Sequence, residues 1–205
     1  MKLALVFAYA GVLSGLLCIM VRFLGLQLDL HIKKLETIIL CVCQFILGSA
    51  VLYCESNIMT ALLCMAVLGM ESVIDYKKRV VLVFPLLIPA GAAMCSCFLQ
   101  YQRLAPDLRV MELLLALSCL ALMFFTAFPM KMQGRGDFYV FAVMFSYFLY
   151  ANPYFVGSMC VCLLLLAYTA LLVGLIISRI FGNKSWTLPF VPFLYVSFCV
   201  VVILI

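Results

Sequence analysis

Apolar segments that follow one another along the chain constrain its fold more than any other feature of the sequence. A transmembrane helix needs about 20 mainly apolar residues. Eight such segments, some shorter than this, cover residues 3–25, 37–54, 58–74, 80–100, 111–128, 138–151, 154–177 and 189–205. The chain is only 10% charged, whereas a soluble domain carries about 25% charged residues. The sequence therefore predicts an all-α, polytopic membrane protein with about eight transmembrane helices, in which residues 1–205 form one domain.

Basic residues alternate between the two sides of these predicted spans. Ten of the 13 lysines and arginines follow the first, third, fifth and seventh spans: Arg22, Lys33, Lys34, Lys77, Lys78, Arg79, Lys131, Arg135, Arg179 and Lys184. The opposite side holds only Lys2, Arg103 and Arg109. Because positive charge is enriched in cytoplasmic loops, we expect the first group in the cytoplasm and both termini outside.

Eleven cysteines and a single histidine give no metal-binding pattern. Several cysteines form Cys-x-Cys pairs, at 41/43, 95/97 and 160/162, and residues two apart on a helix point in different directions. A Cys-x-x-Cys signature is absent, and His31 has no cysteine near it. We interpret the cysteines as small apolar packing residues and predict no metal site.

Three of the eight acidic residues belong to spans or span ends on the predicted cytoplasmic side: Glu71, Asp75 and Asp137. The other five are interpreted as solvated or interfacial charges: Asp29, Glu36, Glu55, Asp107 and Glu112. Asp75 ends the third span and Asp137 opens the sixth, so the topology places both at one membrane face. A charge at the bilayer centre costs about 2.5–3.5 kcal/mol, and an acid nearer the interface costs less.

Each of these three acids also has a simpler interpretation. Asp75 could neutralise the basic residues 77–79 that follow it. This is less fitting for Asp137, because Gly134 and Gly136 allow backbone conformations closed to other residues and let another segment approach closely. Glu71 lies one turn before Asp75 on the same helix face. It is either a third polar group that tunes the pair or a protonated acid packed against a neighbouring helix.

Three stretches together resemble the type IV prepilin peptidases, a family of membrane aspartic proteases that includes the preflagellin peptidases. "AVLGMESVIDYKKRVV" resembles the stretch with the first catalytic aspartate, and "GRGDFYVFAV" resembles the Gly-x-Gly-Asp motif with the second. "LPFVPFLYVSFCVVVIL" resembles the closing Pro-Phe-x-Pro-Phe-Leu segment. The resemblance covers residues 58–205 and implies catalytic roles for Asp75 and Asp137, with Gly134, Gly136 and Glu71 in support.

The chain departs from the family pattern at several points. Tyr139 stands where members often carry lysine, and Pro85 is displaced from the Ile-Pro that often follows the first aspartate. Residues 1–57 add two spans and do not resemble the cysteine-rich region of the bifunctional, methylating members. The resemblance therefore implies a short form with peptidase activity only.

The mechanism implied by the resemblance needs neither a metal nor an organic cofactor. Two carboxylates about 5 Å apart repel by roughly 3 kcal/mol at an effective dielectric near 20, so the pair is expected to share one proton. The expected partners are a prepilin-like substrate with a basic leader, cut at the cytoplasmic face of the bacterial cell membrane, and anionic lipid, but no nucleic acid. Two other hypotheses stay open: a proton-coupled carrier, and an inactive scaffold of a pilus or secretion apparatus.

Overall fold

The computed structural model describes residues 2–27, 34–54, 58–99, 109–130, 133–180 and 188–204. Its elements are α1 (Lys2–Gln27), α2 (Lys34–Cys54), α3 (Ile58–Lys78), α4 (Val83–Leu99), α6 (Val110–Ala127), α7 (Arg135–Ala151), the 3-10 helix η1 (Pro153–Phe155), α8 (Val156–Ile180) and α9 (Val191–Leu204). The predicted all-α fold is confirmed for these residues. Eight of the residues named in the sequence analysis lie outside these ranges: Asp29, His31, Lys33, Glu55, Arg103, Asp107, Lys131 and Lys184.

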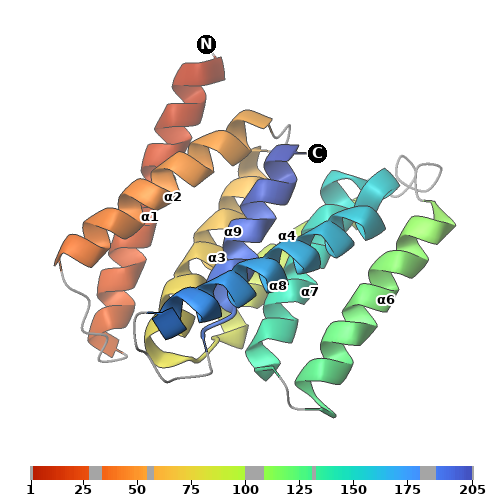
Figure 1. Ribbon diagram of the computed structural model, residues 1–205. Coiled ribbons are helices and arrows are strands. Elements are labelled where there is room, and N and C mark those ends of the chain that lie inside the picture. Colours follow the sequence, from red (N-terminus) through yellow and green to blue (C-terminus); the bar gives the residue numbers. More distant parts are fainter. Residues whose placement is uncertain are drawn as a thin grey trace.

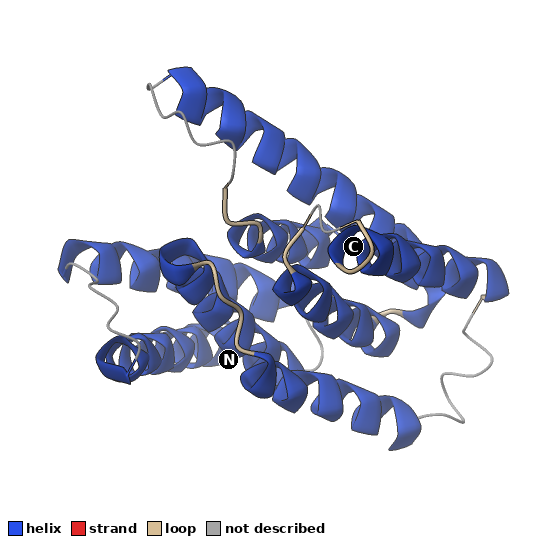
Figure 2. Cartoon of the chain, turned by 90° about the horizontal axis from the view of Figure 1, so that it is seen from below, coloured by secondary structure: helices blue, strands red, loops and turns tan. Residues whose placement is uncertain are grey.

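The helices run alternately up and down the bundle (Figure 1). The C-terminal ends of α1, α3, α6 and α8 point to its lower end, and both chain termini lie at its upper end. Figure 2 views the molecule from the lower end and shows helices and loops, with no strand in the part of the chain that is described. The helix ends that carry the predicted cytoplasmic charges therefore lie at one end of the bundle.

Five helices contain a segment that is long and apolar enough to cross a membrane. These segments are Ala4–Phe23, Glu36–Tyr53, Met59–Lys78, Val110–Ala127 and Pro153–Ile180. Val83–Cys97 and Val191–Leu204 are apolar but shorter, and α7 has 17 residues with Arg135 and Asp137 in its first turn. The membrane-protein prediction is supported, whereas the count of eight spans stays a prediction.

Helix α3 lies in the interior of the bundle. Of its segment Met59–Lys78, 67% is buried, against 22% to 29% in the other four segments. It contacts α1, α2, α4, α7 and α9, while outer helices expose large apolar side chains such as Val12 and Leu165. The acids on α3 are therefore surrounded by protein, as ionisable residues in membrane helices usually are.

Helix α9 packs against α7 through aromatic rings and is linked to α3 through Gln44 of α2. The ring of Phe198 packs against Tyr147 and Phe148 of α7 at centroid distances of 5.3 and 5.4 Å. The Tyr195 hydroxyl donates to Gln44 Oε1 on α2, and Gln44 Nε2 donates to the Met65 carbonyl on α3 at 3.3 Å. Because no water competes within a bilayer, such polar contacts hold helices in register. They determine where the start of α9 meets the end of α3.

Candidate active site

Asp75 lies in the last turn of α3 and is held by the N-terminus of α9. Asp75 is 6% exposed, and its Oδ2 accepts a hydrogen bond from the backbone N–H of Val191 at 3.1 Å. Val191 is the first residue of α9, where backbone N–H groups have no acceptor within the helix and the helix dipole favours negative charge. Pro192 follows at a position where a missing N–H is tolerated. The Pro-Phe-Val-Pro-Phe segment thus presents an unused donor to Asp75.

Asp137 lies in the first turn of α7 and is 7% exposed. Its Oδ2 accepts a hydrogen bond from the N–H of Gly134 at 3.0 Å, and its own N–H donates to the Gly134 carbonyl at 3.0 Å. A carboxylate at this position satisfies a free donor of the helix terminus and interacts favourably with the dipole. Asp137 therefore belongs to the first turn of α7, which begins at Arg135, three residues before the segment 138–151 predicted from hydropathy.

Asp75 and Asp137 line the same cavity, which has a volume of about 390 Å³. Positive charge comes from Arg79 and Arg135, and an apolar wall comes from α8 and the segment before α9. The lining residues are Asp75, Arg79, Val81, Gln133, Gly134, Arg135, Gly136, Asp137, Leu171, Leu175, Leu188, Pro189 and Phe190. Cavities that bind small ligands usually measure about 300–1,000 Å³. The fold thus brings together two carboxylates from separate helices in a space that can admit water and part of a peptide.

The two glycines before Asp137 differ in what they contribute. Gly134 has φ −67° and ψ 140°, an extended conformation open to any residue, and Gly136 does not have a positive φ either. The expectation that these positions need glycine for its backbone freedom is therefore wrong. Close approach is confirmed at Gly136, since a Cβ atom there would lie 2.4 Å from the Cβ of Val81. This contact packs α7 against the loop that follows α3.

Glu71 lies one turn before Asp75 and is completely buried. Its Oε2 accepts the backbone N–H of Leu82 at 2.9 Å, and its Oε1 has no hydrogen-bond partner among the described residues. The side chain therefore forms its hydrogen bond with the loop between α3 and α4 and not with a neighbouring helix.

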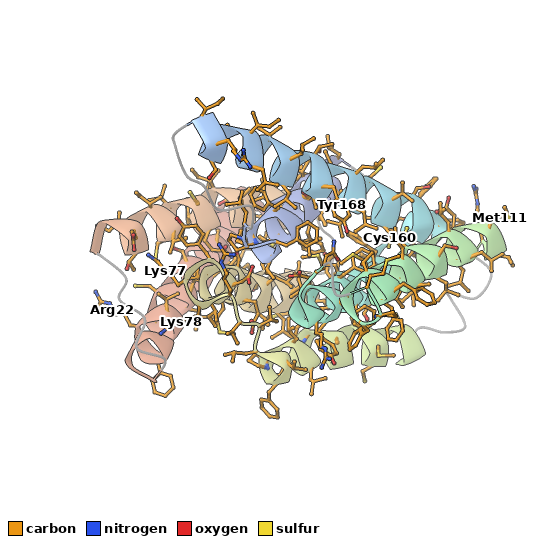
Figure 3. The ribbon with its side chains drawn as sticks, turned by 60° about the horizontal axis from the view of Figure 1, so that its bottom comes forward. Arg22, Lys77, Lys78, Met111, Cys160 and Tyr168 are labelled. Carbon is orange, nitrogen blue, oxygen red and sulfur yellow. The ribbon has the colours of Figure 1, made fainter. Side chains whose placement is uncertain are left out.

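Basic residues gather where α1 and α3 end. Figure 3 brings this end forward and labels Arg22, Lys77 and Lys78. The Nζ atom of Lys77 lies 2.7 Å from Glu36 Oε2 on α2, so this lysine is neutralised by Glu36.

In the described ranges, no group of three or more His, Cys, Asp or Glu side chains could hold a metal ion.

Gln133 is a cavity residue that the sequence did not single out. Its Nε2 donates to the hydroxyl of Tyr168 on α8, and its Oε1 accepts from the Thr126 hydroxyl at 3.2 Å. The Tyr168 ring in turn packs against Phe190, with centroids 5.1 Å apart. These contacts tie the loop before α7 to α8. No local pattern marks a glutamine for this role, because its partners come from elements distant in sequence.

Tyr139, one of the departures from the prepilin peptidase pattern noted in the sequence, belongs to an aromatic cluster. Its ring lies 5.7 Å from that of Phe138 and 6.3 Å from that of Phe128. The Arg135 guanidinium lies 5.6 Å from the centre of the Phe128 ring. Tyr139 therefore packs beside the cavity and is not one of its lining residues.

No model of a known protein family matches the chain. No curated protein sequence and no solved structure matches it either.

Proposed function

We propose that the chain is a membrane-embedded aspartic endopeptidase that removes the leader peptide of type IV prepilin-like proteins. The observation that carries the proposal is the shared cavity of Asp75 and Asp137. These are the two aspartates that the resemblance to the prepilin peptidases selects, and they come from separate helices, α3 and α7.

The proposed reaction uses one proton held between two carboxyl groups. The ionised carboxylate takes a proton from water, and the water oxygen attacks the carbonyl carbon of the peptide bond. The other carboxyl group donates a hydrogen bond to the carbonyl oxygen. When the tetrahedral intermediate collapses, the C–N bond breaks and the amine leaves with a proton from the carboxyl pair. Because the two groups titrate together, neither role belongs permanently to Asp75 or Asp137.

The proposal includes eight membrane crossings, with the cavity facing the cytoplasm of a bacterial cell. With a rise of about 1.5 Å per residue, the 14 residues of α9 span about 21 Å and the 17 residues of α7 about 26 Å. The hydrocarbon core is about 30 Å thick. Short helices here are consistent with a cavity recessed slightly into the cytoplasmic leaflet, where their N-termini meet the two aspartates.

A substrate of this kind fits the two parts of the cavity wall. The apolar residues Leu171, Leu175 and Leu188 suit the start of an apolar substrate helix. The polar side, with Asp75 and Asp137, suits the backbone of the bond to be cut. The basic leader would remain toward the aqueous side, where Arg79 and Arg135 disfavour its deep entry.

Co-expression with a prepilin reporter tests the proposal. The wild-type chain is expected to shorten the reporter, and Asp75→Asn and Asp137→Asn are each expected to reduce the rate about 10²–10⁴-fold. Glu112→Gln is a matched control, because Glu112 also binds a backbone N–H, that of Ser158 at 2.8 Å, and is not a cavity residue.

The same experiment separates the rival functions. A proton flux that depends on Asp75 without any cleavage would indicate a carrier. Assembly of the apparatus that survives both aspartate substitutions would indicate a scaffold. Either result would overturn the peptidase proposal.

A further inference from the structure

We propose that Glu71 is a positioning residue of this site, which holds the segment 79–82 against Gly136 and thereby keeps Asp137 in the cavity with Asp75. The inference rests on the proposed peptidase function. It assigns to the third buried acid a part that differs from that of the two aspartates.

The burial of Glu71 requires a reason, because an acid inside a membrane helix is costly. Glu71 has no exposed surface, and among the described residues its carboxyl group accepts one hydrogen bond, from the Leu82 N–H at 2.9 Å. A backbone N–H buried without an acceptor is itself unfavourable. Glu71 therefore provides the acceptor for the N–H of Leu82, which lies between α3 and α4 and so has no partner from either helix's regular hydrogen bonding.

The loop needs this restraint because it turns sharply at the end of α3. Arg79 has φ 55°, the left-handed conformation that a non-glycine residue adopts at a cost. Its N–H still donates to the Asp75 carbonyl at 2.9 Å. The turn brings the chain back along α3, so that Leu82, eleven residues after Glu71, reaches the Glu71 side chain.

The residue that donates this hydrogen bond and the residue that contacts α7 are direct neighbours in the chain. Val81, directly before Leu82, packs so closely on Gly136 that a Cβ atom there would meet it at 2.4 Å. Asp137 follows Gly136 in the chain. Displacement of the loop would therefore move the backbone next to the catalytic carboxylate.

A direct chemical role for Glu71 fits the geometry less well. Glu71 does not belong to the described residues that line the cavity. With no exposed surface, it cannot touch water or a peptide there. Glu71 therefore does not contact the reacting groups, and its hydrogen bond to Leu82 connects it to the site through the loop.

Glu71→Gln and Glu71→Ala distinguish this positioning role from a direct chemical role, in the 205-residue chain reconstituted in nanodiscs with a prepilin reporter. Glutamine keeps an oxygen acceptor for the Leu82 N–H, so we expect kcat within about threefold of wild type. Alanine removes the acceptor, so we expect kcat to fall about 100-fold, as for a catalytic group misplaced by about 1 Å, with KM changed less than about threefold. Glu71→Leu keeps side-chain volume without an acceptor and serves if the alanine variant does not fold.

Hydrogen–deuterium exchange supplies a readout that does not depend on activity. Exchange in residues 79–83 is expected to accelerate in Glu71→Ala and Glu71→Leu but not in Glu71→Gln. Glu112→Ala, which also removes an acceptor for a backbone N–H, is expected to leave both exchange in 79–83 and cleavage unchanged.

Full cleavage by Glu71→Ala, or a glutamine variant as defective as the alanine variant, would overturn the inference. The proposed function fails separately, if the wild-type chain leaves the reporter uncut. In that case slower exchange at 79–83 in wild type than in Glu71→Ala would still establish the clamp, and equal exchange would refute it.

Discussion

Replacing Gly136 with alanine would place a methyl group where Val81 already lies. The new Cβ would be 2.4 Å from Val81 Cβ and 2.5 Å from its Cγ2, whereas ordinary contact begins at 3.4 Å. The loop and α7 must therefore separate by about 1 Å, and overpacking of this kind costs about 1–3 kcal/mol of folding free energy. Because Asp137 is the next residue, we expect cleavage to fall about 100-fold. Gly136→Val should abolish cleavage and leave the protein inserted in the membrane.

The measurement is the rate of reporter cleavage by purified variants, with thermal unfolding followed in parallel. Gly91→Ala is the matched control, because a Cβ atom at this helical glycine meets nothing within 4 Å. Alanine is favoured over glycine inside a helix by about 0.8–1 kcal/mol, so this variant should be at least as stable as wild type and equally active.

A second substitution tests whether the contact with Val81 is the cause. All three atoms nearest to the added Cβ belong to the Val81 side chain, so Val81→Gly should relieve the clash. The double variant is expected to regain most of the activity lost in Gly136→Ala, a coupling that contacting residues show and distant ones do not. Wild-type cleavage by Gly136→Ala would refute the reasoning, as would a double variant no more active than the single one.

Three further outcomes are expected. Val191→Pro removes the N–H that binds Asp75, and proline is accepted at the first position of a helix. Because a hydrogen bond to a charged group contributes about 1.5–3 kcal/mol, we expect cleavage to slow about 10–100-fold. An unchanged rate would count against a role for α9. Glu112→Ala removes two hydrogen bonds to Ser158, at 2.8 and 2.9 Å; it should lower the unfolding free energy by about 2 kcal/mol without slowing cleavage at the remote cavity. The rate should fall at both low and high pH, because both carboxyls are protonated in acid and both ionised in base; a rate that rises steadily with pH would exclude the shared proton.

Hydropathy predicted the helices well but missed their polar ends. Helix α3 continues to Lys78, four residues beyond the predicted boundary, because its last turn is stabilised from outside the helix. Lys77 pairs with Glu36. Helix α7 starts at Arg135 because Asp137 accepts the N–H of Gly134, the residue directly before the helix. A scale that scores each residue by its apolar character cannot detect helix ends that depend on such contacts.

The candidate site could likewise be predicted only in part from the sequence. The topology alone predicted that Asp75 and Asp137 meet at one end of the bundle, since hairpin ends on one membrane face must gather there. The partner of Glu71 could not be predicted, because it depends on the left-handed turn at Arg79, and nothing in the local sequence favours that conformation there. The donor from Val191 was hidden for a similar reason, since Asp75 and Val191 are 116 residues apart.

Both aspartates serve as helix-terminal acceptors, and this decides which substitutions can isolate their chemistry. In a membrane interior, a backbone N–H without an acceptor costs several kcal/mol. Alanine at Asp75 would leave the buried Val191 N–H in that state, whereas alanine at Asp137 would remove the acceptor of the N–H of Gly134, an exposed residue. Asparagine keeps a side-chain oxygen that can accept both bonds but cannot act as a carboxylate. A loss of cleavage in the asparagine variants therefore reports on catalysis, whereas the same loss in Asp75→Ala would report mainly on folding.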